Sequence, residues 1–511
     1  MKEKSQVRTG IILSYVSLAL STIIPFIYTP IMLRMLGEQE YGLYSLARSV
    51  IGYLGLLSFG LGSTILRYIA TYRAKGEKKQ LENAFGFFLV LYGGIAILTV
   101  LIGLVLTANA EAIFHRGLTG EEISRIRTLL LIMTANTALS FPVSVFTSVT
   151  IAFERYYFRK FVEILYTVAV PLLSLAALYM GFASVGMAMT SLLMQILMVP
   201  LNAGYCMRVL QVRPAFERLP VSLIKEMMGF SVYVFLAMIV EILFWSTDKV
   251  ILGMLINSTA VAVYSVGGTF NEMVGSMSTS ISNVLAPRVT TMVARESTSE
   301  ELSQLFIKVG RIQFLIVALV TSGFVTFGYR FVSMWAGPNY QPAYWIALLT
   351  MLPRVVPLIQ NTGVNIVVAQ NKHKFRSIVY LIIAVINAVS TYLLVPYMGA
   401  VGAALCSCIA YILGHGIIMN LYYLKVTRLD IAAFWRNILG MSVIPVLMTG
   451  AGLILEAAVH TDGWLLFFVK VAAYTALYCA AMYKFIMNDY EKSIITGYLA
   501  RIPLFRKNSH E

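Results

Sequence analysis

Charged residues are scarce in this sequence. Asp, Glu, Lys and Arg make up only 12% of its 511 residues, about half of their usual share in soluble domains. Apolar residues make up 59%, and the mean hydropathy of +0.78 is spread over the whole length without a polar domain. One soluble core cannot account for this surplus, because such cores stop growing near about 250–300 residues. The composition therefore excludes a soluble enzyme and indicates a protein embedded in a bilayer.

Cysteine and histidine are also rare, and the motifs of several enzyme classes are missing. The cysteines all lie in apolar stretches, without partners at the spacing of a metal site or a disulfide framework: Cys206, Cys406, Cys408 and Cys479. The sequence contains no GxxxxGK[ST] nucleotide loop, no HExxH zinc motif and no GxSxG nucleophile motif. We therefore expect no enzyme, no metal and no cofactor. Any energy that the protein uses would then come from an H+ or Na+ gradient, from the membrane potential or from consumption of a product.

Long apolar runs are what the sequence has in place of these features. A helix needs about 20 apolar residues to cross about 30 Å of hydrocarbon. Cutting the sequence at charged and turn residues predicts fourteen such spans, 10–34, 42–66, 84–108, 128–152, 162–181, 186–206, 229–252, 260–285, 312–334, 343–368, 377–396, 401–424, 438–456 and 464–486. The predicted fold is an all-α polytopic membrane protein.

The basic residues predict the orientation of these spans. The formal charge of +15 is typical of some nucleic-acid-binding proteins, but here the basic residues form short runs between apolar blocks. Thirty of the 39 Lys and Arg residues fall in alternate connecting segments, beginning with the N-terminus. Because cytoplasmic loops are enriched in Lys and Arg, both termini are expected in the cytoplasm. The longest outer segment, 109–127, is too short for an external domain, so we expect the function to lie within the cytoplasmic membrane and to involve no nucleic acid.

Three pairs of segments indicate an internal repeat. They occur in the same order at offsets of 216 to 220 residues: IMLRMLGEQEYGLYSLA (31–47) with VILGMLINSTAVAVYSVG (250–267), ERYYFRKF (154–161) with NKHKFRS (371–377), and MGFASVG (180–186) with MGAVG (398–402). Each repeat contains six spans, so both have the same orientation and pair about an axis along the membrane normal. The predicted division is an N-lobe (1–224), a C-lobe (225–425) and two additional helices with a cytoplasmic tail (426–511).

Ionisable residues inside spans are candidates for function, because each costs about 2.5–3.5 kcal/mol on insertion scales. Arg354 lies deepest, and Asn361 and Asn365 follow it at i+7 and i+11, which predicts a polar stripe along one helical face. This stripe either lines a cavity or belongs to a structural ion pair. Arg48 is a second cavity candidate, although its side chain is also near enough to the outer surface to reach the headgroups.

Other polar residues fall on shared faces of the predicted helices. Asn136 begins a polar face that continues with Ser140, Ser144 and Thr147, in the span that corresponds to that of Arg354. Lys470 is expected to extend to the membrane surface.

The acidic candidates for ion coupling are Glu272, Glu241 and Asp248. Glu272 either faces a cavity or neutralises Arg354. Glu241 and Asp248 share a helical face and could form a site for a proton or another cation. Alternatively, Asp248 forms an ion pair with Lys249 near the membrane surface.

Several segments carry a resemblance to a known family. They are LGEQEYGLYSLARS (36–49), LRYIATYRAKGE (66–77), TDKVILGML (247–255), ERYYFRKF (154–161) and MGAVGAA (398–404). These segments resemble the polysaccharide-exporter branch of the multidrug/oligosaccharidyl-lipid/polysaccharide (MOP) superfamily, which includes Wzx-type flippases and, more distantly, lipid II flippases. The resemblance implies two six-helix lobes in a V with a central cavity. Fourteen spans are similar to the lipid II-like members, whose last two helices are thought to form a groove for the lipid tail.

The resemblance also implies a function. It suggests a flippase that moves a polyprenyl-diphosphate-linked oligosaccharide to the outer leaflet by alternating access. The partners that it implies are membrane lipids and glycan polymerases or glycosyltransferases. Arg354, Arg48 and Arg34 are the cations that would hold the diphosphate. The alternative within the superfamily is a proton- or sodium-coupled multidrug antiporter that uses Glu241 or Glu272. A membrane-bound glycan polymerase or ligase is disfavoured, because such enzymes usually carry catalytic residues on a large outer loop.

Overall fold

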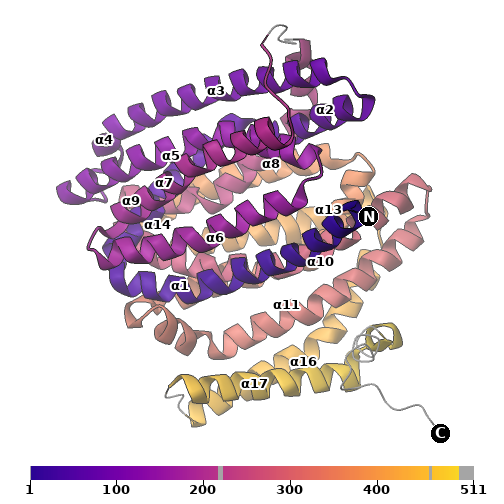
Figure 1. Ribbon diagram of the computed structural model, residues 1–511. Helices are drawn as coiled ribbons and strands as arrows, with labels where there is room; N and C mark the ends of the chain where they lie inside the picture. The colour runs from indigo at the N-terminus through magenta and orange to yellow at the C-terminus, as the bar shows by residue number, and fades with distance from the viewer. Residues whose placement is uncertain (1, 217–221, 460–462, 494–511) are drawn as a thin grey trace. The chain divides into compact units, whose positions relative to one another are not determined.

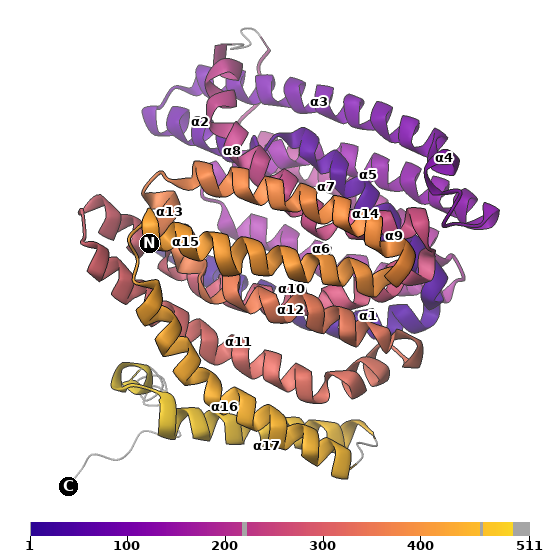
Figure 2. The ribbon, with the colours of Figure 1, turned by 180° about the vertical axis from the view of Figure 1, so that it is seen from behind.

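The computed structural model describes residues 2–216, 222–459 and 463–493, and every regular element in these ranges is helical (Figures 1 and 2). The helices of the first half are α1 (Lys2–Leu54), α2 (Gly62–Lys75), α3 (Lys78–Ala108), α4 (Ala110–Phe114), α5 (Gly120–Ala152), α6 (Tyr156–Tyr179), α7 (Ala183–Gly204), α8 (Ser222–Trp245) and α9 (Thr247–Leu255). Those of the second half are α10 (Ser258–Ala294), α11 (Ser299–Trp335), α12 (Pro342–Ile359), α13 (Asn361–Ala369), α14 (His373–Tyr411), α15 (Met419–Lys425), α16 (Ile431–Ala458) and α17 (Trp464–Ala481). Short 3-10 or π-helical turns cover Gly55–Ser58, Tyr205–Val209, Pro338–Tyr340, Ile412–Ile418 and Met482–Ile486.

The predicted spans lie on these helices, except that 42–66, 229–252 and 343–368 each contain a break, at 59–61, at Ser246 and at Gln360. Within the described ranges, ten helical stretches are long and apolar enough to cross a membrane. Two of them, Val16–Lys75 and Lys374–Lys425, are long enough for two crossings each. Both bend at a glycine with a positive φ, Gly37 (φ 74°) and Gly399 (φ 56°), between the spans predicted there. The prediction of an all-α polytopic membrane protein is confirmed.

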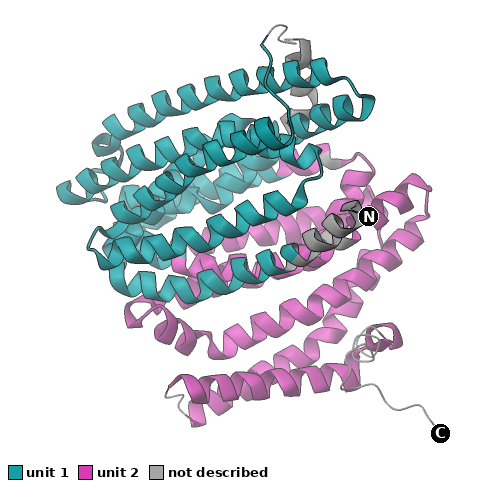
Figure 3. Ribbon diagram, viewed as in Figure 1, with its two compact units in different colours: residues 1–265, 380–403 teal, residues 266–379, 404–511 magenta. Residues whose placement is uncertain are grey.

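The chain forms two compact units (Figure 3). Unit 1 contains residues 1–265 and 380–403, and unit 2 contains residues 266–379 and 404–511. These units are not the lobes predicted from the sequence, because residues 225–265 and part of α14 pack with the first six spans. The division into lobes at residues 224 and 425 stays a prediction.

Matching local features show the internal repeat in the structure. Phe158 stacks on Tyr205 with ring centroids 3.6 Å apart and planes at 3°, and Phe375 stacks on Tyr422 at 4.6 Å and 7°. Both residues of the second pair lie 217 positions after their counterparts. The left-handed conformations recur at the same offset: at Glu154 and Asn371, and at Gln211 and Arg428. The predicted repeat is therefore confirmed by backbone geometry as well as by sequence.

Unit 1 is built around α5, which packs against α3, α7, α2 and α1, while α1 also packs along α6. Its core contains edge-to-face ring pairs between α3 and α5, Phe85 with Phe146 and Tyr92 with Phe141. Small residues allow close backbone approach at one end of the unit. A Cβ atom on Gly42 would overlap the carbonyl oxygen of Ser258, and the Ser258 hydroxyl donates to the Glu122 carboxylate. The turn before α10 is thus fastened to α1 and α5.

Unit 2 is built around α11, which packs against α12, α16 and α17. Arg311 of α11 makes a bidentate ion pair with Glu491 at 2.6 and 2.9 Å, and its third nitrogen donates to Asn437 of α16 at 3.0 Å. Both charged side chains are buried. This pair attaches the C-terminal helices to α11.

The expectation that Lys470 extends to the membrane surface is wrong. Lys470 is buried in α17, and its ammonium group donates to the Glu456 carboxylate of α16 at 3.0 Å. A neighbouring acid 14 positions away in the sequence compensates the charge inside the helix pair, so the side chain has no need to reach the headgroups.

The close approach at Gly42 gives a first testable prediction. Gly42→Ala should lower the melting temperature of the purified protein in detergent by several degrees, because overpacking against the fixed Ser258 backbone costs about 1–3 kcal/mol. Gly93→Ala in α3 is the matched control, since a Cβ atom there meets no atom within 4 Å. Equal melting temperatures for the two variants would contradict this account of the packing.

Candidate functional site

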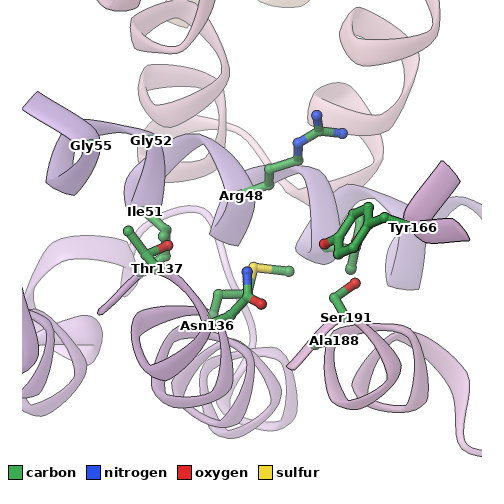
Figure 4. Close-up of a pocket in the computed structure, with 11 residues that line it drawn as sticks. Arg48, Ile51, Gly52, Gly55, Asn136, Thr137, Tyr166, Ala188 and Ser191 are labelled. Atoms are coloured by element: carbon green, nitrogen blue, oxygen red, sulfur yellow. The ribbon is translucent and has the colours of Figure 1, made fainter. Parts of the chain in front are cut away.

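A cavity of about 420 Å³ lies in unit 1, among four helices (Figure 4). Its lining combines aromatic, apolar and polar residues from α1 and the turn after it, from α5, from α6 and from α7: Tyr44, Arg48, Ile51, Gly52, Gly55, Met133, Asn136, Thr137, Tyr166, Ala188 and Ser191. The residues from α1 follow the helical repeat, since Arg48 and Ile51 come four and seven positions after Tyr44. One face of the second half of α1 therefore forms a wall of the cavity.

Arg48 is the single charged residue among those that line this cavity. Its side chain is exposed, and it makes no hydrogen bond or ion pair within the described ranges. No acidic residue lines the cavity. A guanidinium group stays charged at any physiological pH and binds phosphate or carboxylate oxygens in a bidentate manner. The arrangement is therefore suited to an anion.

Neutral polar groups also line this cavity. Figure 4 shows Asn136 and Ser191 on the side of α1 away from which the Arg48 guanidinium group extends, with the Tyr166 hydroxyl directed toward the space between them and α1. The sequence pattern predicted Asn136 and Arg48 as site residues, but it did not predict the tyrosines or Ser191. The spacing of Tyr44 and Arg48 by four residues was an available signal for the first tyrosine, whereas Tyr166 and Ser191 reach the site only through the packing of α6 and α7.

Arg354 occupies a separate position in unit 2. It is half-buried in α12, and it donates to the backbone carbonyl and to the side-chain oxygen of Asn271 in α10 at 2.9 and 3.0 Å. Its guanidinium group lies against Gly275, where a Cβ atom would be 2.9 Å from one of its nitrogens. Glu272 is exposed and forms no ion pair with Arg354 in the described part of the chain. Gly275, one turn after Asn271 in α10, thus leaves room for the Arg354 guanidinium group.

The polar stripe predicted from Arg354 to Asn365 is interrupted. The helix ends at Ile359, and α13 begins at Asn361 after a break at Gln360 (φ −102°, ψ 11°). The buried Gln360 side chain donates to Asn420 of α15 at 2.8 Å, and the Trp435 indole of α16 donates to the same Asn420 oxygen at 2.9 Å. Asn361 and Asn365 are half-buried beyond this break. Helical spacing counted through Gln360 therefore does not place them on the face of Arg354.

The remaining candidates differ in burial. Arg34 and Glu241 are exposed, and neither lines the cavity of unit 1. Asp248 is fully buried in α9, where it accepts hydrogen bonds from the hydroxyls of Tyr264 and Thr391, the latter at 3.1 Å. Within the described residues, no group of three or more His, Cys, Asp or Glu side chains is arranged to hold a metal ion. Asp248 is thus a carboxylate held by hydroxyl groups in the interior of unit 1.

The hydroxyl donors around Asp248 give a second testable prediction. Tyr264→Phe should lower the free energy of unfolding by about 1.5–3 kcal/mol, because it removes a hydrogen bond to a buried charged group. Thermal unfolding in detergent measures this loss. Tyr392→Phe is the control, because that ring on α14 is exposed, and it should leave the melting temperature unchanged. The account fails if Tyr264→Phe is as stable as the control.

Comparison with solved structures defines the class of fold. The lipid II flippase MurJ in an inward closed conformation superimposes with a TM-score of 0.72 at 14% identity, covering 96% of this chain and 100% of that one. An inward-facing multidrug resistance MATE family transporter of the MOP superfamily gives a TM-score of 0.61 at 16% identity, covering 83% and 99%. The protein therefore has the fold of MOP-type transporters. These two neighbours are described as a flippase and a transporter.

The family follows from the sequence comparison. The model of the polysaccharide biosynthesis protein family matches residues 7–293, which is more than half of the chain. The protein belongs to this family, as the resemblance of its sequence segments suggested. It is also 21% identical over 466 residues to EpsK, an uncharacterized membrane protein of Bacillus subtilis (strain 168), with 90% of this chain and 91% of EpsK covered.

Proposed function

We propose that the protein is a flippase that moves a polyprenyl-diphosphate-linked oligosaccharide from the inner to the outer leaflet of the cytoplasmic membrane by alternating access. The family supports a role in polysaccharide biosynthesis. The observation that carries the proposal is Arg48, a cation without an acidic partner among the residues that line a polar cavity between helices of a membrane protein. An unpaired cation at such a position is costly in hydrocarbon and is retained where an anionic substrate pairs with it. Arg354 and Arg34 are additional cations for the diphosphate at other stages of transport.

The competing function is that of a proton- or sodium-coupled antiporter for organic cations. A cation-binding cavity needs acidic or aromatic groups free of nearby positive charge, whereas the cavity of unit 1 contains Arg48 and no acidic residue. A deletion strain separates the two functions. A flippase predicts loss of surface polysaccharide with unchanged susceptibility to cationic dyes, and an antiporter predicts the opposite.

The role of Arg48 gives a third testable prediction. In proteoliposomes with a fluorescent undecaprenyl-diphosphate oligosaccharide, Arg48→Gln should slow translocation at least about tenfold, the effect of losing a charge-assisted hydrogen bond of about 1.5–3 kcal/mol. Arg48→Lys should retain part of the rate, because it keeps the charge and loses the bidentate geometry.

Arg116→Gln is the matched control for this experiment. It removes the same charge from unit 1 at an exposed position outside the cavity, and it should translocate the lipid at the wild-type rate. Equal rates for Arg48→Gln and the control would remove the basis of the proposal.

The membrane potential is the proposed energy source. A headgroup with about two negative charges that leaves an inside-negative cell gains about 2.3 kcal/mol per charge per 100 mV when its charge moves uncompensated. As a fourth prediction, collapse of the potential in sealed vesicles should slow net export several-fold. A rate independent of the potential would instead favour H+ or Na+ coupling, for which Asp248, Glu241 and Glu272 are the candidate groups.

The proposal also includes the orientation of the protein in the membrane and its functional partners. The excess of Lys and Arg in alternate connecting segments supports a location of both termini in the cytoplasm. The glycosyltransferases that build the glycan on the inner leaflet and the polymerase that extends it on the outer leaflet are the expected functional partners.

A further inference from the structure

The cavity of unit 1 contains more neutral hydrogen-bonding groups than a diphosphate needs. Besides Arg48, its polar lining consists of an amide, two aliphatic hydroxyls and two phenol hydroxyls: Asn136, Thr137, Ser191, Tyr44 and Tyr166. A diphosphate presents only acceptors and is best matched by cations and other donors. A ligand that presents both donors and acceptors is a better match to amide and hydroxyl groups.

Asn136 is one of the groups in this lining whose side chain makes no hydrogen bond with the described part of the protein. Its amide forms no hydrogen bond within the described part of the chain, and its Oδ1 is buried. The Oδ1 is closed to a ligand, whereas the Nδ2 is not among the buried unpartnered atoms, so this donor is open to a ligand acceptor. Ser191 already uses its proton, because its hydroxyl donates to the Met187 carbonyl at 3.1 Å. Its oxygen remains available as an acceptor.

The rest of the wall is suited to a ring with apolar faces. Ile51, Met133 and Ala188 are buried apolar residues, and Tyr44 and Tyr166 each combine an aromatic face with a polar edge. A pyranose ring has the same division, with C–H groups on its faces and hydroxyls around its edge. The volume of about 420 Å³ also lies within the range of about 300–1,000 Å³ that is typical of small-ligand pockets.

We infer that this cavity is a saccharide subsite, which binds one sugar residue of the lipid-linked glycan through Asn136 and Ser191. Arg48 holds the phosphate to which that sugar is attached. This inference rests on the proposed flippase function and adds to it that the protein recognises the sugar itself, and not only the diphosphate and the lipid. The protein accordingly transports sugar-bearing lipid in preference to the bare lipid diphosphate.

The test compares two probes in the same proteoliposomes: undecaprenyl diphosphate without sugar, and the same lipid with a single N-acetylhexosamine. The measured quantity is the ratio of the two translocation rates, which does not depend on the amount of folded protein. Wild type should favour the sugar-bearing lipid. Asn136→Leu should lower this ratio about three- to tenfold, the effect of one or two lost hydrogen bonds of about 0.5–1.5 kcal/mol each.

Two further variants complete the design. Ser191→Ala, a smaller change, should lower the ratio in the same direction. Asn202→Leu is the matched control, because this buried amide of α7 donates to its own helix at Met198 and lies outside the cavity lining. Its ratio should equal that of wild type, and Arg48→Gln should slow both lipids.

The outcomes separate the inference from the proposed function. If wild type translocates both lipids and Asn136→Leu slows them equally or not at all, the saccharide subsite is refuted while the flippase function stands. If wild type translocates neither lipid, the flippase function fails, and the subsite fails with it.

Discussion

The absence of water from the hydrocarbon core of a bilayer is the constraint on which this structure depends. Each buried polar group must find a partner within the protein or in a ligand, because lipid offers none. The buried charged groups in the described part of the chain, inside and beside the predicted spans, all have partners within the protein. Arg311 pairs with Glu491, Lys470 pairs with Glu456, and Asp248 accepts two hydroxyl donors. These pairs fix the C-terminal helices to α11 and to each other, and they fix α9 to its neighbours.

Two polar groups without a partner in the protein meet in one cavity, although buried oxygens without a partner also occur elsewhere in the described residues, as at Thr64, Thr134 and Thr362. Arg48 has no partner within the described ranges, and neither does the amide of Asn136, yet both line one cavity in unit 1. The internal repeat allows the lining of this cavity to be compared with the second half of the chain. At the offset of 217 that relates the two stacked aromatic pairs, Arg354 corresponds to Thr137, which lines the same cavity. Each repeat thus has a polar residue at this position. It is Thr137 in the first repeat and Arg354 in the second, where Asn271 accepts a hydrogen bond from it.

Much of the fold could be predicted from the sequence, because membrane spans, turns and repeats are local or periodic features. The turns near residues 37 and 399 and the paired segments at offsets near 217 were all accessible in this way. The break at Gln360 was not, because it depends on Asn420 and on the packing of α15 and α16. The burial of Asp248 and the pairing of Lys470 were missed for the same reason: hydrophobicity gives the depth of a residue in the membrane and does not identify its partner.

The most direct test of the central claim is photo-crosslinking of the cavity with its proposed ligand. An undecaprenyl-diphosphate sugar with a diazirine on the sugar ring would be irradiated with the purified protein in lipid nanodiscs, and the labelled peptides would be identified by mass spectrometry. The account predicts labels on the segments of α5 and α7 that contain Asn136 and Ser191, which an excess of unlabelled glycolipid removes. Labels confined to other helices, such as α16 and α17, or labels that unlabelled glycolipid does not displace, would contradict it.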